Sequence, residues 1–169
     1  MNKYIVIIFI MLTLIVLESF VVPAKVSMPV LGATDKDWSH QSFWYRPWGV
    51  SGVHKGIDIF AKKGTPVRAA QGGLVVYRGD IKLGGNVVLV MSKRGWLHYY
   101  AHLNTVRTDK HLIRQGEIIG SVGNSGNAKN KPPHLHYAVL NLIPRPLEFQ
   151  FSAQGWKLMF YRNPSELII

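Results

Sequence analysis

The sequence predicts a mainly β protein, built as a single domain around an antiparallel sheet or sandwich. The chain has 169 residues, a length that suits one domain. Short stretches rich in β-branched and aromatic residues are separated by Gly, Pro and Asn turns about every 8–12 residues, which is typical of antiparallel sheets. No stretch after residue 24 sustains the 3.6-residue period of a helix over three turns.

The first two predicted strands lie in the middle of the chain. Val67 to Tyr77 is rich in β-branched residues, but Gly72-Gly73 interrupts it and indicates a tight turn or a bulge. Asn86 to Met91 is a compact apolar strand that follows the turn signal Gly84-Gly85.

Three further strands follow. Trp96 to His102 is rich in aromatic residues, and 93–95 before it makes a good hairpin connection. Glu117 to Val122 and His134 to Leu140 are two more short strands, and the polar loop 123–133 separates them. The two prolines that end this loop stiffen it, so we expect it to form one wall of a groove.

The N-terminus predicts export. Tyr4 to Leu17 is a run of 14 residues behind Lys3 that is apolar except for Thr13. This length suits the apolar region of a signal peptide and falls short of the roughly 20 residues of a membrane-spanning helix. We expect residues 1–24 to be a signal peptide cleaved after Ala24; the alternative is an uncleaved N-terminal anchor that tolerates Glu18. Residues 25–42 are expected to be an irregular lead-in to a folded domain at 43–169.

Charge and cysteine content narrow the possible functions. There are 20 Lys and Arg residues against 9 Asp and Glu, a net charge of +11, and no cysteine. The missing cysteines exclude disulfides, thiol catalysis and Cys-ligated zinc. The charge predicts an anionic partner: nucleic acid, anionic lipid or an anionic cell-wall polymer. Loss of residues 1–24 would leave the charge at +11, so an exported basic domain disfavours nucleic acid.

Histidines carry the strongest signal for chemistry. His134 and His136 open a predicted strand, so both imidazoles should point to one face while Leu135 faces the core. His54 and Asp58 also share a face if their segment is extended, and Gly56 places no side chain between them. Two nitrogens and one carboxylate oxygen, with water as the fourth ligand, make a catalytic zinc site. Taken alone, His134-Leu135-His136 favours a strand with one buried, hydrogen-bonded imidazole, but the second pair, His54 and Asp58, weakens that interpretation.

Other hydrolase designs lack their motifs. No histidine precedes a glutamate, as the HExxH zinc helix requires, and Gly123-Asn124-Ser125-Gly126 does not fit the G-x-S-x-G nucleophile elbow. Paired-carboxylate glycosidase chemistry has no motif behind it among so few acids. Glycine loops of the P-loop or Rossmann type are also missing from the sequence.

Three motifs resemble the signatures of the lysostaphin/LytM-type zinc peptidases, which are endopeptidases that cut the peptide part of peptidoglycan. The motifs are His54-Lys55-Gly56-Ile57-Asp58, Tyr100-Ala101-His102-Leu103 and Pro133-His134-Leu135-His136-Tyr137. Additional similarity occurs in the same order at Gly64-Thr65-Pro66-Val67, Gly84-Gly85-Asn86-Val87-Val88, Gly116-Glu117-Ile118-Ile119-Gly120 and Asn163-Pro164. The resemblance covers roughly residues 43–165.

The resemblance implies a fold and a site. The fold would be the lysostaphin-type peptidase fold, a duplicated hybrid motif with a groove, which makes 43–169 the catalytic domain. His54, Asp58 and His136 would bind one zinc ion per chain, and His102 and His134 would be the non-ligand catalytic histidines. Zinc would activate the attacking water, one imidazole would move its proton and the other would stabilise the oxyanion. The sequence leaves open which histidine takes which role.

Several other residues have two readings. His98 lies four residues before His102, on the same face of the predicted strand, and is expected to pack or face solvent rather than support the site. The aromatic cluster upstream of His54 either lines a substrate groove or packs the lead-in on the sheet; its members are Trp38, Phe43, Trp44, Tyr45 and Trp48. Asn86 is expected at a turn beside the site, in a groove or structural role.

The function expected from these observations is an exported zinc-dependent endopeptidase (a murein endopeptidase) that hydrolyses amide bonds in the peptide cross-links or stems of peptidoglycan. It would act in the periplasm or elsewhere at the cell envelope, with peptidoglycan and anionic envelope polymers as partners and no nucleic acid. Membrane contact is expected only if the N-terminal segment stays uncleaved. The alternatives are a non-catalytic family member that binds and regulates cell-wall amidases, and a basic envelope-binding protein. A D-Ala–diaminopimelate cross-link and a glycine bridge are both compatible as the bond cut.

Overall fold

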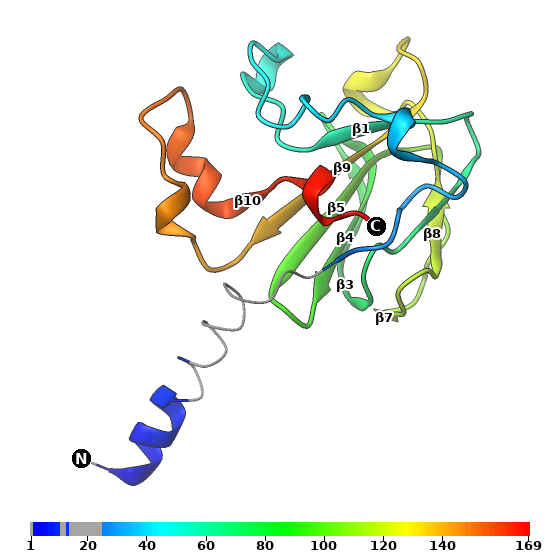
Figure 1. Ribbon diagram of the computed structural model, residues 1–169. Coiled ribbons are helices and arrows are strands. Elements are labelled where there is room, and N and C mark those ends of the chain that lie inside the picture. Colours follow the sequence, from blue (N-terminus) through cyan, green and yellow to red (C-terminus); the bar gives the residue numbers. More distant parts are fainter. Residues whose placement is uncertain (1, 11–12, 14–24) are drawn as a thin grey trace.

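The computed structural model describes residues 2–10, 13 and 25–169 (Figure 1). Residues 3–10 are helical. The strands are β1 Ile57–Phe60, β2 Pro66–Arg68, β3 Gly73–Ile81, β4 Gly85–Ser92, β5 Trp96–Leu103, β6 Thr105–Val106, β7 Leu112–Ile113, β8 Ile118–Ser121, β9 His134–Asn141 and β10 Tyr161–Arg162. Short 3-10 turns and one helical turn connect them: η1 Asp35–Asp37, η2 Gly49–Ser51, η3 Gly126–Ala128, η4 Pro146–Glu148, η5 Gly155–Phe160 and α2 Pro164–Leu167.

Two antiparallel sheets form the domain, which confirms the predicted fold class. The large sheet has the order β1-β9-β5-β4-β3-β7, and β10 pairs with the part of β9 beyond β1. The small sheet has the order β2-β8-β6. Residues of the core cluster come from both sheets, among them Tyr100 and Val139 of the large sheet and Val67 and Ile119 of the small one. One face of the large sheet therefore packs in the core, and its other face is left for a cleft.

The predicted strand at 67–77 is two strands in different sheets. Val67 pairs with Gly120 in the small sheet, whereas Gly73 pairs with Ser92 in the large sheet. The predicted break at Gly72-Gly73 is the crossing point between them. A Cβ at Gly73 would collide with the Met91 carbonyl, so the close approach of β3 to β4 requires glycine there.

The lead-in is irregular, but it is part of the core. Between residues 25 and 42 the structure has one 3-10 turn and isolated bridges rather than strands. Val26 bridges to Ile168 and Val30 bridges to Val67, and both valines are fully buried. Trp38 is buried as well, and its indole N–H donates to the Ser165 hydroxyl. For Trp38, the packing alternative therefore holds rather than the groove.

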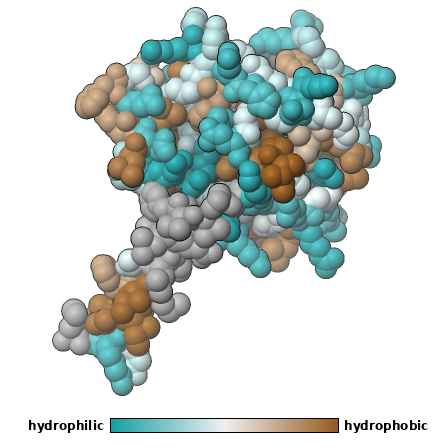
Figure 2. Space-filling model, in the orientation of Figure 1, coloured by the Kyte–Doolittle hydropathy of each residue, from teal (hydrophilic) through white to brown (hydrophobic). Residues whose placement is uncertain are grey.

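Most of the predicted signal segment lies outside the described residues, including its expected cleavage site after Ala24. Among the described residues, no helix is both long and apolar enough to cross a membrane. Figure 2 shows that hydrophilic side chains cover most of the face drawn of the domain, with smaller apolar patches between them.

His98 points into the core, which makes it a packing residue. It is fully buried, and its Nε2 donates to Gln71 Oε1 (3.2 Å) while its Nδ1 accepts from the Tyr137 hydroxyl (2.8 Å). Both bonds use the neutral ring. Burial lowers the pKa of His98 to about 4, so protonation opposes folding.

This burial predicts a pH-dependent stability. In the unfolded chain His98 titrates near 6.5, so below that pH the unfolded state binds more protons and the free energy of unfolding falls as pH drops towards 4. The contribution of His98 should be about 3 kcal/mol across that window. Urea titrations at pH 7 and pH 4.5 should show a smaller pH-dependent loss for His98→Gln than for the wild type. An equal loss in both proteins would contradict the assignment.

Candidate metal centre and catalytic cleft

The pairing of β1 with β9 brings two of the three candidate ligands together. Asp58 lies opposite His136 in the register of this antiparallel pair. Ile57, Ile59 and Leu135 are fully buried on the core face, so Asp58, His134 and His136 take the opposite face. The predicted alternation of His134, Leu135 and His136 is confirmed.

His54 reaches the same place from the loop before β1. Its ring stacks on Trp48 (centroids 4.1 Å apart) and its Nδ1 donates to the Ser42 carbonyl (3.0 Å). Gly56 allows this approach, because a Cβ there would collide with the Tyr137 carbonyl and lie 3.0 Å from His136 Cε1. The Nδ1 bond fixes the neutral tautomer of His54, so Nε2 has a lone pair and no hydrogen.

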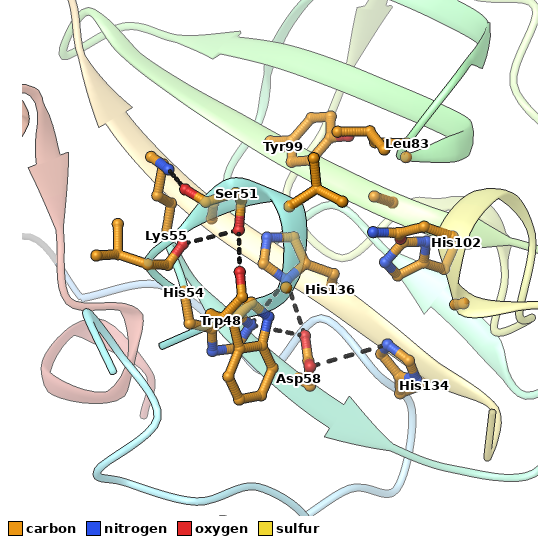
Figure 3. A pocket seen from close by; sticks show the side chains of 18 of the residues that line it. Trp48, Ser51, His54, Lys55, Asp58, Leu83, Tyr99, His102, His134 and His136 are labelled. Carbon is orange, nitrogen blue, oxygen red and sulfur yellow. Dashed lines mark hydrogen bonds and ion pairs between the residues drawn. The ribbon is translucent and has the colours of Figure 1, made fainter. Parts of the chain in front are cut away.

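Three electron-pair donors converge on one point (Figure 3). Asp58 Oδ1 is 3.0 Å from His54 Nε2 and 2.8 Å from His136 Nδ1, and the two nitrogens are 3.1 Å apart. Burial opposes ionisation of Asp58, but the imidazoles of His136 and His54 beside its carboxylate outweigh burial and hold its pKa below the usual range. A carboxylate facing a bare imidazole nitrogen requires a shared cation or proton. Two imidazole nitrogens and one carboxylate oxygen are ligands suited to zinc, whose ligand atoms stand about 3.3 Å apart in a tetrahedral site.

His102 and His134 lie beside this cluster, and each is held by a hydrogen bond from its Nδ1 to a backbone carbonyl. His102 Nδ1 donates to the Ser125 carbonyl (2.9 Å), and His134 Nδ1 donates to the Pro132 carbonyl (2.8 Å). Their ring centroids are 5.0 Å apart, and His134 Nε2 is 3.9 Å from Asp58 Oδ2. In its neutral form, each ring therefore presents an Nε2 without a hydrogen. Burial, together with His136 and His134, lowers the pKa of His102 to about 4, which keeps this nitrogen free to accept a proton at neutral pH.

A local backbone reversal turns His102 towards the cleft, and this corrects the expectation that His98 and His102 share a face. His102 has φ 62°, in the left-handed region that a non-glycine residue rarely adopts. Strand alternation therefore ends at His102. His98 faces the core, while His102 lines the cleft together with Tyr99 and Ala101.

Ser125 holds His102 in this conformation. Its carbonyl accepts from the His102 ring, its hydroxyl donates to the Leu103 carbonyl (2.9 Å), and Asn86 N donates to the same hydroxyl (2.9 Å). The hydroxyl thus joins the 123–133 loop to β4 and to the end of β5. The sequence reasoning did not select Ser125, whose only signal was its place in the loop opposite the Gly84-Gly85 turn.

Ser125→Ala should lower kcat about tenfold with zinc content unchanged, because losing the hydroxyl leaves the Asn86 backbone N–H unpaired, removes one of the two bonds to the Leu103 carbonyl and loosens His102. Ser121→Ala is a matched control, since that hydroxyl makes a similar bond to Thr105 in the small sheet. Steady-state kinetics with metal analysis would test this. Equal losses in the two variants would reduce Ser125 to a contributor to stability.

The cleft has a volume of about 740 Å³, and its floor on the large sheet is apolar: Leu89, Leu97, Ala138 and Leu140 line it. Trp48 also lines the cleft, whereas Tyr45 is half-exposed outside it and contacts the Trp48 ring edge-on. Asn86 is not among the lining residues, and its side chain donates to the Leu103 carbonyl (3.1 Å). The structure thus brings Trp48 to the site and places Tyr45 and Asn86 beside it.

Sequence reasoning also did not select Tyr99 and Lys55, which line the cleft. The Tyr99 ring meets His136 edge-on (centroids 6.1 Å), and burial, with a smaller effect of Tyr161, raises the pKa of Tyr99 to about 12. Its hydroxyl therefore stays protonated at neutral pH. Burial and the nearby charge of Lys157 lower the pKa of Lys55.

Comparison with known proteins identifies one peptidase family and several similar endopeptidases. Residues 52–145 match peptidase family M23. The chain is 37% identical over 114 residues to an L-Ala–D-Glu endopeptidase of Bacillus subtilis, covering 61% of this chain and 35% of that protein. It is 35% identical over 90 residues to the peptidoglycan DD-endopeptidase ShyC of Vibrio cholerae, covering 52% of this chain and 20% of that protein. The chain thus spans about a third or less of these relatives.

Among solved structures, the catalytic domain of lysostaphin from Staphylococcus simulans has the same fold. The TM-score is 0.56 at 29% identity, and the match covers 70% of this chain and 81% of that domain.

Proposed function

The chain belongs to peptidase family M23, and from this premise we propose that it is a zinc-dependent endopeptidase that hydrolyses amide bonds in the peptide part of peptidoglycan. The observation that carries the proposal is the convergence of His54 Nε2, Asp58 Oδ1 and His136 Nδ1 within 3.1 Å of one another, beside two further histidines. The names of the endopeptidases similar to this chain support the substrate class.

His54, Asp58 and His136 would hold the metal. Bound zinc would supply Lewis-acid polarisation and a lowered pKa for water at the site. The apolar floor of the cleft and Trp48 would hold the peptide above the ligands and limit access of other water.

His102 and His134 would move protons at their Nε2 atoms. Each ring gives its Nδ1 hydrogen to a backbone carbonyl, so each Nε2 can accept a proton and return it to a leaving amine. After protonation, either ring can donate a hydrogen bond to a developing oxyanion. The two rings are close enough to divide these tasks on one substrate.

Export to the cell envelope is part of the proposal. The apolar segment at 4–17 supports it, and so do the names of relatives that are lipoproteins or cell-division proteins. The net charge of +11 would favour binding to anionic polymers of the envelope.

Digestion of purified peptidoglycan, followed by mass analysis of the released muropeptides, tests this function. The proposal expects fragments with new amino termini from a single type of peptide bond, which would also identify that bond. Binding to peptidoglycan without any fragments would instead favour a non-catalytic member that acts through amidases.

A further inference from the structure

The segment between β9 and β10 contacts the loop that carries Ser51, a residue that lines the cleft, and most of this segment lies beyond the residues that match the family. It contains η4 and η5, in orange in Figure 1, whereas the family match ends at residue 145. Gln154 in this segment donates through Nε2 to the Ser51 carbonyl (2.9 Å). The segment is therefore fastened to the loop that precedes His54.

The same contact places two ammonium groups near each other. The Ser51 carbonyl also accepts from Lys55 Nζ (3.0 Å), and Gln154 Oε1 accepts from Lys157 Nζ (3.0 Å). Gly52 permits this packing, because a Cβ there would lie 2.6 Å from Gln154 Nε2. Lys55 and Lys157 are thus both held by Ser51 and Gln154 rather than extended freely into solvent.

Among the residues that the structure describes, no carboxylate pairs with either ammonium group. Within residues 25–169, the lysine ion pair that the structure contains is between Lys110 and Glu117, far along the chain from this cluster. Ser51 and Gln154 offer neutral oxygens only, and the Lys157 ammonium group also lies over the Trp156 ring (5.4 Å to its centroid), so neither positive charge is neutralised by an anion among the described residues. Two like charges held together without a counter-ion form a place where an anion is stabilised.

Lys55 places this pair of lysines beside the part of the cleft that a peptide substrate would occupy. Lys55 follows the candidate ligand His54 in the chain and lines the cleft. In Figure 3, Lys55 lies on one side of His54, Asp58 and His136, while His102 and His134 lie on the other side. A peptide that crosses the candidate ligands would therefore pass the lysine side of the cleft.

We propose that Lys55 and Lys157 form a subsite that binds a free carboxylate of the peptide substrate. This inference rests on the proposed function, since it assumes that a peptide occupies the cleft. It assigns to the segment beyond the family match a role in substrate choice: acidic stem peptides would be preferred over their amidated forms and over uncharged glycine chains.

Equilibrium binding of two peptides tests the proposal. The probes are the stem tetrapeptide L-Ala-γ-D-Glu-L-Lys-D-Ala with free carboxylates and the same peptide with its carboxylates amidated. Calorimetry would use the full zinc-loaded chain carrying His102→Ala to suppress turnover. In this background the free acid should bind at least about fivefold more tightly than the amide, and added Lys157→Gln should bring the ratio close to one.

Lys93→Gln is the matched control, because it removes the same charge from an exposed turn at 93–95 outside the cleft. It should retain the preference for the acid. A preference that survives Lys157→Gln, or that Lys93→Gln removes equally, would overturn the subsite.

Hydrolysis of both peptides by the chain with His102 intact is measured separately. Acid-selective binding without hydrolysis would uphold the subsite and contradict the proposed function. Hydrolysis without acid-selective binding would uphold the proposed function and contradict the subsite.

Discussion

Asp58→Asn should abolish zinc retention and peptidoglycan hydrolysis together. The substitution keeps the size of the side chain, but it removes the anionic oxygen that lies 3.0 Å from His54 Nε2 and 2.8 Å from His136 Nδ1. Two neutral imidazoles alone make an incomplete zinc site. Loss of the metal would remove the electrophile, so we expect kcat/KM to fall by at least about ten-thousand-fold.

Metal analysis after dialysis and a hydrolysis assay would measure both effects, and thermal unfolding would separate them from misfolding. Zinc should raise the Tm of the wild type and leave that of Asp58→Asn unchanged, because only the wild type binds it tightly in the folded state. Asp80→Asn is the control, since Asp80 is an exposed acid on the β3–β4 hairpin. Stoichiometric zinc in Asp58→Asn would refute the ligand assignment.

His102→Ala should keep zinc and lose turnover. His102 is not within the group that could hold the metal, and its Nε2 faces the cleft with Nδ1 fixed on the Ser125 carbonyl. Removal of a positioned acid–base group lowers kcat by about a hundred- to ten-thousand-fold. Substrate binding through the rest of the cleft should persist, so KM should change little.

The control for this variant is His111→Ala, which removes an exposed histidine that lies outside the cleft. Single-turnover kinetics on zinc-loaded proteins would show whether the chemical step itself is slowed. If His102→Ala also lost its zinc, or turned over at the rate of His111→Ala, His102 would have no part in proton transfer.

Local patterns predicted most of the sheet and the directions of several site residues. The alternation along His134, Leu135 and His136 was sufficient to place two histidines on one face, because both neighbours of Leu135 point away from the core. Strand alternation does not hold between His98 and His102, which were expected to share a face, because a positive φ at His102 interrupts it. That conformation depends on contacts with Gly84 and Ser125, and such distant contacts leave no periodic trace in the sequence.

Long-range packing accounts for the other differences between the predicted and the observed structure. Residues 25–42 lack any regular pattern, and yet Val26 and Val30 enter the core by pairing with Ile168 and Val67. The stretch at 67–77 reads as one strand, but its two halves belong to different sheets. Likewise, the approach of Gln154 to Ser51 spans 103 residues and is set by the fold rather than by either local sequence.

Release of new amino termini from purified peptidoglycan, with and without a metal chelator, tests the central claim most directly. We expect steady release by the zinc-loaded protein, loss of release after chelation, and recovery when zinc is restored. Equally rapid release by the metal-free protein would contradict it, because His54, Asp58 and His136 would then have no metal-dependent role in the reaction.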